Sequence, residues 1–373
     1  MSYSFRLGRL FGIPIYIHVS WFVIFALVTF ALSRRVFPSI YPGWSSGLAM
    51  TVGLATSLLF FASVVAHEVA HSLVSRLYGN PVRSITLFIF GGLARITREA
   101  SQPKAELVMA AAGPASSLVI GGLFGLVWWL AGPYSDPVGA LSIWLAYINV
   151  VLAVFNMVPG FPLDGGRVLR SLIWRYTGNY KRATRMATLA GQGLGYTLML
   201  LGVLWVFLIG NWLGGMWWIF IGWFLRNAAS SSYQQTVLRE SLRGFTAREV
   251  MTQDCITVPR DLTLGQMVRD SVLPSGRRCF LVAEQGRLEG IVTMGNIKSV
   301  RRELWDSTPL SRVTTPQDRL RTAHPAESAI SIMETMEEED INQMPVVEEE
   351  RVIGLILRDS LIHIMRTRSE LGS

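Results

Sequence analysis

The amino-acid sequence predicts a polytopic α-helical membrane bundle with about six transmembrane helices, followed by a cytosolic α+β domain. Half of the 373 residues are hydrophobic and the mean hydropathy is +0.37, which excludes a disordered chain, a fibrous chain and an all-soluble enzyme. Several apolar runs are long enough to cross a bilayer, which takes about 20 residues. Charge is divided unevenly, because residues 1–243 carry a net charge of +12 and residues 244–373 a net charge of −4.

This division of charge indicates two kinds of domain. The sequence pI of about 9.8 comes from an apolar, basic membrane part and not from a basic face on a soluble domain, so no nucleic-acid partner is expected. The predicted boundaries are a membrane domain over 1–228, a polar linker over 229–244, and two soluble halves over 245–305 and 309–368.

The predicted spans also have a predicted orientation. They lie near residues 16–33, 47–77, 107–131, 138–158, 188–210 and 211–228. With the N-terminus in the cytosol, the outside loops hold only Arg34 and Arg35 as basic residues, as the positive-inside rule requires. An even number of spans then places the soluble part in the cytosol. Its cysteines, Cys255 and Cys279, lack the spacing of a metal site or a disulfide scaffold, which agrees with a reducing compartment.

One motif in the second predicted span points to chemistry. Glu68 is the first acidic residue of the chain, and it lies within His67-Glu68-Val69-Ala70-His71. The i, i+4 spacing puts both imidazoles on one face of a helix, where they can share a metal ion. Glu68 projects beside them toward a metal-bound water. Ionisable side chains are costly in a bilayer, so the cluster favours a metal site over chance or a structural polar cluster.

A catalytic zinc site takes a third protein ligand, and Asp164 is the best candidate. It follows the fourth predicted span in a segment rich in proline and glycine, 156–166, where a regular helix is not expected. Irregular backbone at membrane depth is tolerated where it lines a cavity or packs on protein. Spans two and four both run toward the cytosol, so His67 and Asp164 are expected at the same depth. The alternative is an exposed aspartate on a loop.

Together these residues resemble the site-2 protease family of intramembrane zinc metalloproteases. The matching pieces are His67-Glu68-x-x-His71, Asn156-x-x-Pro159 with Leu163-Asp164-Gly165, Ala112-Gly113-Pro114, Phe90-Gly91-Gly92, and the opening Gly12–His18. The resemblance covers about residues 1–228. It implies that His67, His71 and Asp164 bind one Zn²⁺ per chain and that Glu68 is the catalytic base. It also implies that Asn156 contacts the substrate or the developing oxyanion.

The chemistry of these residue types agrees with the resemblance. Zinc activates water and polarises a carbonyl group, and Glu68 can take a proton from that water and pass it to the leaving amine. The Asn156 amide can donate a hydrogen bond to the oxyanion.

Two further segments have predicted structural roles. Residues 84–90 are β-prone and end at Gly91-Gly92, so they are predicted as an edge strand that pairs with an unwound substrate, or alternatively as a hairpin covering the bundle. If the segment pairs with substrate, Phe90, Gly91 and Gly92 are the expected substrate contacts. Ala112-Gly113-Pro114 is expected to allow close helix packing.

The two soluble halves repeat one pattern of short strands and helices, with Cys279-Phe280-Leu281-Val282 and 288–293 in the first half and Met344-Pro345-Val346-Val347 and 352–356 in the second. They resemble a pair of CBS domains, and the soluble domain is called the CBS pair below. The resemblance implies an adenosine nucleotide bound between the halves, with Thr293 as the contact that matches the pattern Gly-x-x-Thr-x-x-Asp. Asn296 replaces the aspartate of that pattern, and Leu357 and Ser360 replace both residues in the second half. A dimerisation module without a nucleotide is the alternative.

The sequence therefore predicts a zinc metalloprotease that hydrolyses a peptide bond in or near a transmembrane segment of a membrane protein, regulated by the CBS pair. The expected partners are the transmembrane substrate, membrane lipid and a second copy of the chain. A metal transporter and an inactive homologue that binds transmembrane segments stay open as alternatives. Transport does not explain Glu68 between the histidines, and the complete ligand set argues against an inactive homologue.

Overall fold

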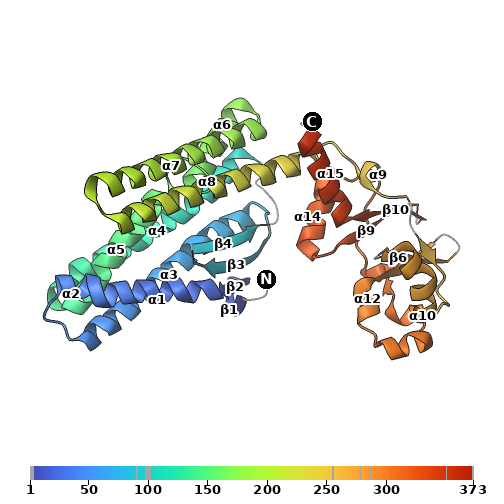
Figure 1. Ribbon diagram of the computed structural model, residues 1–373, viewed down its shortest axis with the longest axis horizontal. Coiled ribbons are helices and arrows are strands. Elements are labelled where there is room, and N and C mark those ends of the chain that lie inside the picture. Colours follow the sequence, from blue (N-terminus) through green and yellow to red (C-terminus); the bar gives the residue numbers. More distant parts are fainter. Residues whose placement is uncertain are drawn as a thin grey trace. The chain divides into compact units, whose positions relative to one another are not determined.

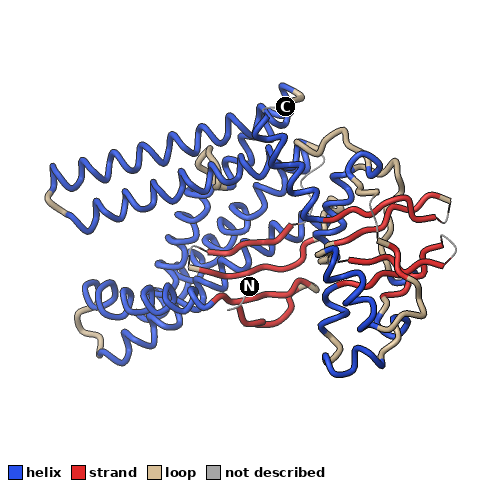
Figure 2. The backbone as a smooth tube through the Cα atoms, turned by 45° about the vertical axis from the view of Figure 1, so that its right-hand side comes forward, coloured by secondary structure: helices blue, strands red, loops and turns tan. Residues whose placement is uncertain are grey.

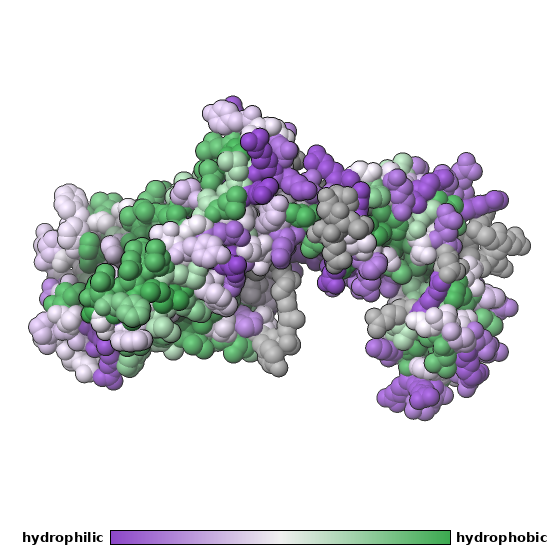
Figure 3. Space-filling view, turned by 45° about the horizontal axis from the view of Figure 1, so that its top comes forward, coloured by the Kyte–Doolittle hydropathy of each residue, from purple (hydrophilic) through white to green (hydrophobic). Residues whose placement is uncertain are grey.

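The computed structural model of the chain describes residues 4–89, 91–96, 102–253, 256–277, 279–284, 287–349 and 351–371. The chain divides into two compact units, Met1–Thr236 and Val237–Ser373. The first consists of long helices and a small sheet, and the second of short helices around another sheet (Figures 1 and 2). In Figure 3, apolar side chains cover much of the visible face of the first unit, whereas polar side chains predominate on the second.

Five helical segments of the described residues are long and apolar enough to cross a membrane. They are Val19–Ile40 (α1, Val19–Ala31; a π-helical turn, Leu32–Val36; α2, Phe37–Ile40), α3 (Ser46–Leu77), Pro103–Tyr134 (α4, Pro103–Ala131, and a 3-10 turn), α5 (Asp136–Asn156) and α7 (Tyr180–Ile209). These correspond to the first five predicted spans. The predicted α-helical membrane bundle is therefore confirmed as a fold class, although α4 and α7 begin several residues earlier than predicted.

The sixth predicted span lies in α8 (Trp212–Glu240), which is not among these five. α8 packs on α7 at two pairs of glycines, where a Cβ at Gly195 would lie 2.7 Å from the Gly222 carbonyl and one at Gly202 would lie 2.6 Å from the Gly215 carbonyl. Glycine is therefore needed for this close approach. A bilayer crossing by α8 stays a prediction. The helix also continues through most of the predicted linker.

A four-stranded sheet in the order β1-β2-β3-β4 belongs to the first unit. β1 (Ser4–Leu10) and β2 (Ile13–His18) form an antiparallel hairpin, β3 (Val82–Phe88) is parallel to β2, and β4 (Gly91–Ile96) is antiparallel to β3. The prediction of residues 84–90 as an edge strand is therefore wrong. β3 is an inner strand because Ile15 of β2 pairs with Ile85, a long-range pairing without a local sequence signal. The edge strands of this sheet are β1 and β4, and β4 begins at Gly91-Gly92.

The helix α6 (Asp164–Thr177) begins at Asp164 itself, within the segment for which no regular helix was expected. Its first glycines serve packing and do not break the helix. A Cβ at Gly165 would collide with the Met157 carbonyl, and one at Gly166 would collide with the backbone of Gly160. The irregular segment is therefore short and folds tightly onto the first turn of α6.

The two halves of the second unit share one sheet in the order β5-β6-β7-β10-β9, with β8 beside β7. The first half contains β5 (Thr257–Val258), α10 (Leu264–Met267), a π-helical turn (Val268–Val272), α11 (Leu273–Ser275), β6 (Cys279–Glu284), β7 (Arg287–Thr293) and α12 (Met294–Lys298). The second contains α13 (Leu310–Val313), β8 (Thr315–Pro316), α14 (Ala329–Glu339), β9 (Gln343–Glu348), β10 (Arg351–Leu357) and α15 (Arg358–Leu371).

Each half begins with a segment that packs on the other half. α9 (Ala247–Val250) lies in the hydrophobic core of the second half, and the Ala247 N–H donates to the Glu327 carbonyl at 2.7 Å. Conversely, Leu310 of α13 is buried in the core of the first half, and its N–H donates to the Leu262 carbonyl at 2.9 Å. The two halves are therefore interlocked and form one structural unit.

Candidate metal centre

The helix α3 carries both histidines and the glutamate of the His-Glu-x-x-His motif. The Ser45 hydroxyl caps its N-terminus by accepting a hydrogen bond from the Leu48 N–H at 3.2 Å. His67 and His71 lie one turn apart on the same face, with their ring centroids separated by 4.8 Å. Both side chains are buried, so they face other protein elements and not the surrounding medium.

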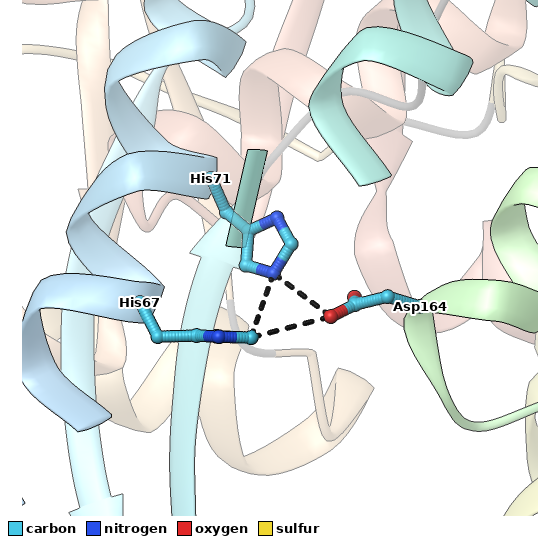
Figure 4. A group of neighbouring side chains, drawn as sticks. All are labelled: His67, His71 and Asp164. Atoms are coloured by element: carbon cyan, nitrogen blue, oxygen red, sulfur yellow. Dashed lines mark hydrogen bonds and ion pairs between the residues drawn. The ribbon is translucent and has the colours of Figure 1, made fainter. Parts of the chain in front are cut away.

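The Asp164 carboxylate, from the first turn of α6, points at the two imidazoles (Figure 4). Its Oδ2 lies 3.2 Å from His67 Nε2 and 3.1 Å from His71 Nε2, and the two nitrogens are 3.2 Å apart. The structure thus brings together the three residues that the sequence names as ligands. Their ligand atoms lie within 4.8 Å of one another, close enough to hold one metal ion.

The helix α4 orients both imidazoles from behind. His71 Nδ1–H donates to the Met109 carbonyl at 2.7 Å; because a carbonyl only accepts, Nε2 of the neutral ring keeps its lone pair. His67 Nδ1 lies 2.9 Å from the Ser117 hydroxyl. Such contacts fix the tautomer and orientation of metal-binding histidines. Two imidazole nitrogens and one carboxylate form the donor set of a catalytic zinc site.

Gly113 of α4 makes room for the two rings. A Cβ at this position would collide with the imidazoles of both His67 and His71. The sequence predicted only close helix packing here, because the motif gives no sign that the small residue faces the histidines. Ser117 and the Met109 carbonyl have no recognisable sequence signal as partners of the histidines.

The irregular segment before Asp164 is held by α7. The Phe161 N–H donates to the Ala187 carbonyl at 3.1 Å. A Cβ at Gly191 would collide with the Phe161 backbone, and a Cβ at Gly160 would lie 2.7 Å from Gly191. The position of Asp164 therefore depends on a close backbone contact between this segment and α7.

Glu68 lies beside the edge strand of the small sheet. A Cβ at Gly92 would collide with Glu68 Cγ and would lie 2.9 Å from the carboxyl carbon. The half-buried Glu68 side chain therefore passes directly against the backbone of β4. Glu68 thus lies next to β4, an edge strand of the sheet that the described residues form.

The remaining predicted residues of the membrane domain have separate positions. Asn156 is the last residue of α5, and its side-chain amide donates to the Leu152 carbonyl at 3.0 Å. Its predicted contact with substrate or oxyanion stays a prediction. Gly91 and Gly92 begin β4, and Phe90 lies outside the described residues.

A cavity of about 830 Å³ lies where the two halves of the second unit meet, and Thr293 lines it. The Thr293 hydroxyl and N–H both donate to Asn296 Oδ1, at 2.6 Å and 2.9 Å, in the cap of α12. Arg277 and Lys298 bring positive charge to the lining. Asp359 brings a carboxylate that the sequence pattern missed, because it lies one position before Ser360.

Family models match both parts of the chain. The model described as Peptidase family M50 matches residues 55–141 and 133–201, and the model described as CBS domain matches residues 247–303 and 311–367. The first match includes all three candidate ligands, and the second covers the two interlocked halves.

Proteins of similar sequence extend over nearly the whole chain. The proposed zinc metalloprotease sll0528 of Synechocystis is 35% identical over 98% of this chain and 97% of its own length. The proposed zinc metalloprotease Rip3 of Mycobacterium tuberculosis is 32% identical over 90% of this chain and 86% of its own length. Among solved structures, the site-2 protease from Methanocaldococcus jannaschii is 27% identical, covers 61% of this chain and 94% of its own, and gives a TM-score of 0.41.

Proposed function

Because the chain belongs to the M50 peptidase family, the site-2 proteases, and carries a pair of CBS domains, we propose that it is an intramembrane zinc metalloprotease. The observation that carries the proposal is the convergence of His67, His71 and Asp164, with Glu68 beside them. The motif lies on α3, a helix long and apolar enough to span a membrane. The proposed reaction is hydrolysis of a peptide bond in or near a transmembrane segment of another protein.

The side chains of His67, His71 and Asp164 converge so that they would hold one Zn²⁺. Zinc in this site supplies Lewis acidity, which activates a water molecule and polarises the scissile carbonyl. Glu68 accepts the proton of the attacking water and passes it to the amine that leaves. The contacts of His67 with Ser117 and of His71 with the Met109 carbonyl keep the imidazoles oriented. Asn156 is the proposed donor to the oxyanion.

The edge strand β4 is the proposed binding surface for an unwound substrate. A peptide in a transmembrane helix hydrogen-bonds to itself and must be extended before cleavage. The edge of a sheet offers unpaired backbone groups to an extended segment. The contact between Gly92 of β4 and Glu68 supports this proposal, because a segment added to β4 would lie next to the proposed base. Gly91 and Gly92 belong to this surface.

The orientation predicted from the charges is part of the proposal. The N-terminus and the CBS pair are cytosolic, the chain is a multi-pass protein of the cell membrane, and the active site lies in the cytosolic part of the bilayer. Membrane lipid then surrounds the apolar helices of the first unit.

The proposed function is tested by cleavage of a single-span substrate by the purified full chain in detergent. We expect cleavage to stop when a chelator removes zinc and to resume when zinc is restored. Cleavage that persists without metal contradicts the proposal. Zinc flux into vesicles without cleavage would favour the transporter, and substrate binding without cleavage would favour the inactive homologue.

We further propose that the CBS pair binds an adenosine nucleotide and joins two chains as a homodimer. The cavity lined by Thr293, Arg277 and Lys298 supports nucleotide binding, since its size and positive charge suit a phosphorylated nucleoside. Calorimetry on the full chain with ATP, ADP and AMP tests this proposal. Absence of binding heat with all three contradicts it. The mass of the chain in detergent, measured by light scattering, tests the dimer separately.

A further inference from the structure

A buried ion pair joins α4 to α6 near the candidate metal centre. Glu106 of α4 is fully buried, and Arg170 of α6 is 8% exposed. Arg170 Nε donates to Glu106 Oε1 at 2.6 Å, and Nη2 donates to the same oxygen. The other carboxylate oxygen, Oε2, is buried and has no hydrogen-bond partner within the described part of the chain. Neither residue takes part in the chemistry proposed above.

Stability alone is a poor explanation for this pair. Moving two charges out of water costs about as much as their attraction returns, and the unsatisfied Oε2 adds to that cost. The guanidinium of Arg170 is also held between two aromatic rings, 4.9 Å from the centroid of Phe161 and 4.7 Å from that of Tyr180. Phe161 belongs to the irregular segment that leads into Asp164. The ring contacts and the ion pair together fix the orientation of the Arg170 guanidinium.

One face of α4 contacts both the metal-centre histidines and α6, the helix that bears Asp164. Glu106, Met109, Gly113 and Ser117 follow the i, i+3, i+7, i+11 spacing of a single helix face. The first contacts Arg170, and the others contact the histidine rings. α4 thus holds the imidazoles along the same face on which it holds the helix that bears Asp164.

We propose that Glu106 and Arg170 are positioning residues for the third metal ligand. Asp164 and Arg170 lie six positions apart on α6, about 9 Å along the helix axis. Arg170 contacts α4 through Glu106 and the segment that leads into Asp164 through the Phe161 ring. The pair thus fixes both the start of α6 and the helix itself against α4, and so holds the Asp164 carboxylate at the imidazole nitrogens. This inference rests on the zinc site of the proposed function.

Two variants of the full chain in detergent test the inference, with zinc affinity measured by chelator competition. Arg170→Lys keeps the positive charge but loses the planar fork and the ring contacts. The double substitution Glu106→Gln with Arg170→Met removes both charges and leaves no unpaired ion in the core. We expect both variants to weaken zinc binding by about 10- to 100-fold, which is the usual effect of mutating a residue that supports a metal ligand. With zinc in excess, kcat should fall while KM stays unchanged.

Arg226→Lys is the matched control. Arg226 of α8 also contacts an aromatic side chain, because its Nε donates to the Tyr196 hydroxyl at 3.2 Å and its guanidinium lies 5.7 Å from that ring. This substitution should leave zinc affinity unchanged.

The wild-type chain is measured first. Its failure to bind zinc would contradict the proposed function itself. If the wild type binds zinc and both variants bind it within twofold of wild type, the positioning role is wrong whatever happens to Tm. An equal loss in the Arg226 control, or failure of both variants to fold, would assign the pair to general stability and also overturn the inference.

Discussion

Glu68 and the two histidines share one helical turn, but substitutions should separate proton transfer from metal binding. Glu68→Gln keeps the shape of the side chain and removes the base. We expect zinc content to stay at the wild-type level and the cleavage rate to fall by about 10²- to 10⁴-fold, the usual contribution of a general base. His67→Ala and Asp164→Ala should lose both metal and activity. Metal analysis and a cleavage assay on the same samples check this; a wild-type rate for Glu68→Gln contradicts the assigned mechanism.

Gly113 offers a second test with a control on the same helix. A methyl group added by Gly113→Ala meets both imidazoles, whereas Gly122→Ala adds one where no atom lies within 4 Å. Both substitutions raise the helix propensity of α4 equally. We expect Gly113→Ala to weaken zinc binding by at least about tenfold and Gly122→Ala to leave it unchanged. Equal zinc affinity in the two variants would show that the rings have room to move.

What the sequence predicted at the residue scale depends on how local the signal is. The local spacing of one motif on one helix was enough to predict the roles of His67, Glu68 and His71. Asp164 lies 97 residues after His67 and was predicted from its place after the fourth predicted span and from the family resemblance. The Met109 carbonyl was not predictable in this way, because every residue carries a carbonyl and only the fold selects one. Ser117 was not predictable either, because its hydroxyl contact with His67 depends on the packing of α4 against α3.

At the scale of elements, the contact between α7 and the segment before Asp164 should control the third ligand. Gly191→Ala would place a methyl group on the Phe161 backbone, which cannot move aside as a flexible side chain can. Gly193→Ala, two positions further along α7, meets nothing within 4 Å. We expect Gly191→Ala to cost about 1–3 kcal/mol of stability through overpacking and to weaken zinc binding.

Thermal unfolding and zinc titration of this pair of variants provide the check. Gly193→Ala should match the wild type in both. If Gly191→Ala also binds zinc like the wild type, the backbone of α7 does not determine where Asp164 lies.

The elements themselves were predicted unevenly. Long apolar helices were recognised because a bilayer requires a minimum length of apolar sequence. The order of the strands in the sheet was not predicted, because the parallel partners β2 and β3 are separated in the sequence by α1 and α3. The packing of α9 and α13 was not predictable either, because each is short and adjoins its own half in the sequence. The hydrogen bonds from Ala247 to Glu327 and from Leu310 to Leu262 place them on the opposite half.

For the whole molecule, orientation in the membrane is the property that can be tested most directly. Tyr134 and Tyr176 are exposed to similar extents, 89% and 86%, and lie on opposite sides in the predicted topology. In a background without Cys255 and Cys279, Tyr134→Cys should react with a membrane-impermeant maleimide in intact cells. Tyr176→Cys should react only after permeabilisation. The opposite pattern would invert the bundle and place the CBS pair outside.

The interlocked halves of the CBS pair determine when this unit can fold during synthesis. The N–H of Ala247 finds its acceptor in Glu327, and Thr252 exchanges two backbone hydrogen bonds of 2.9 Å with Leu355. A ribosome adds residues from the N-terminus, so the first residues of this unit wait for partners translated about a hundred codons later. Until then the apolar face of α9 has no core to enter. A message cut between the halves would yield a chain in which α9 has no core to enter, so both halves must be translated before either core is complete.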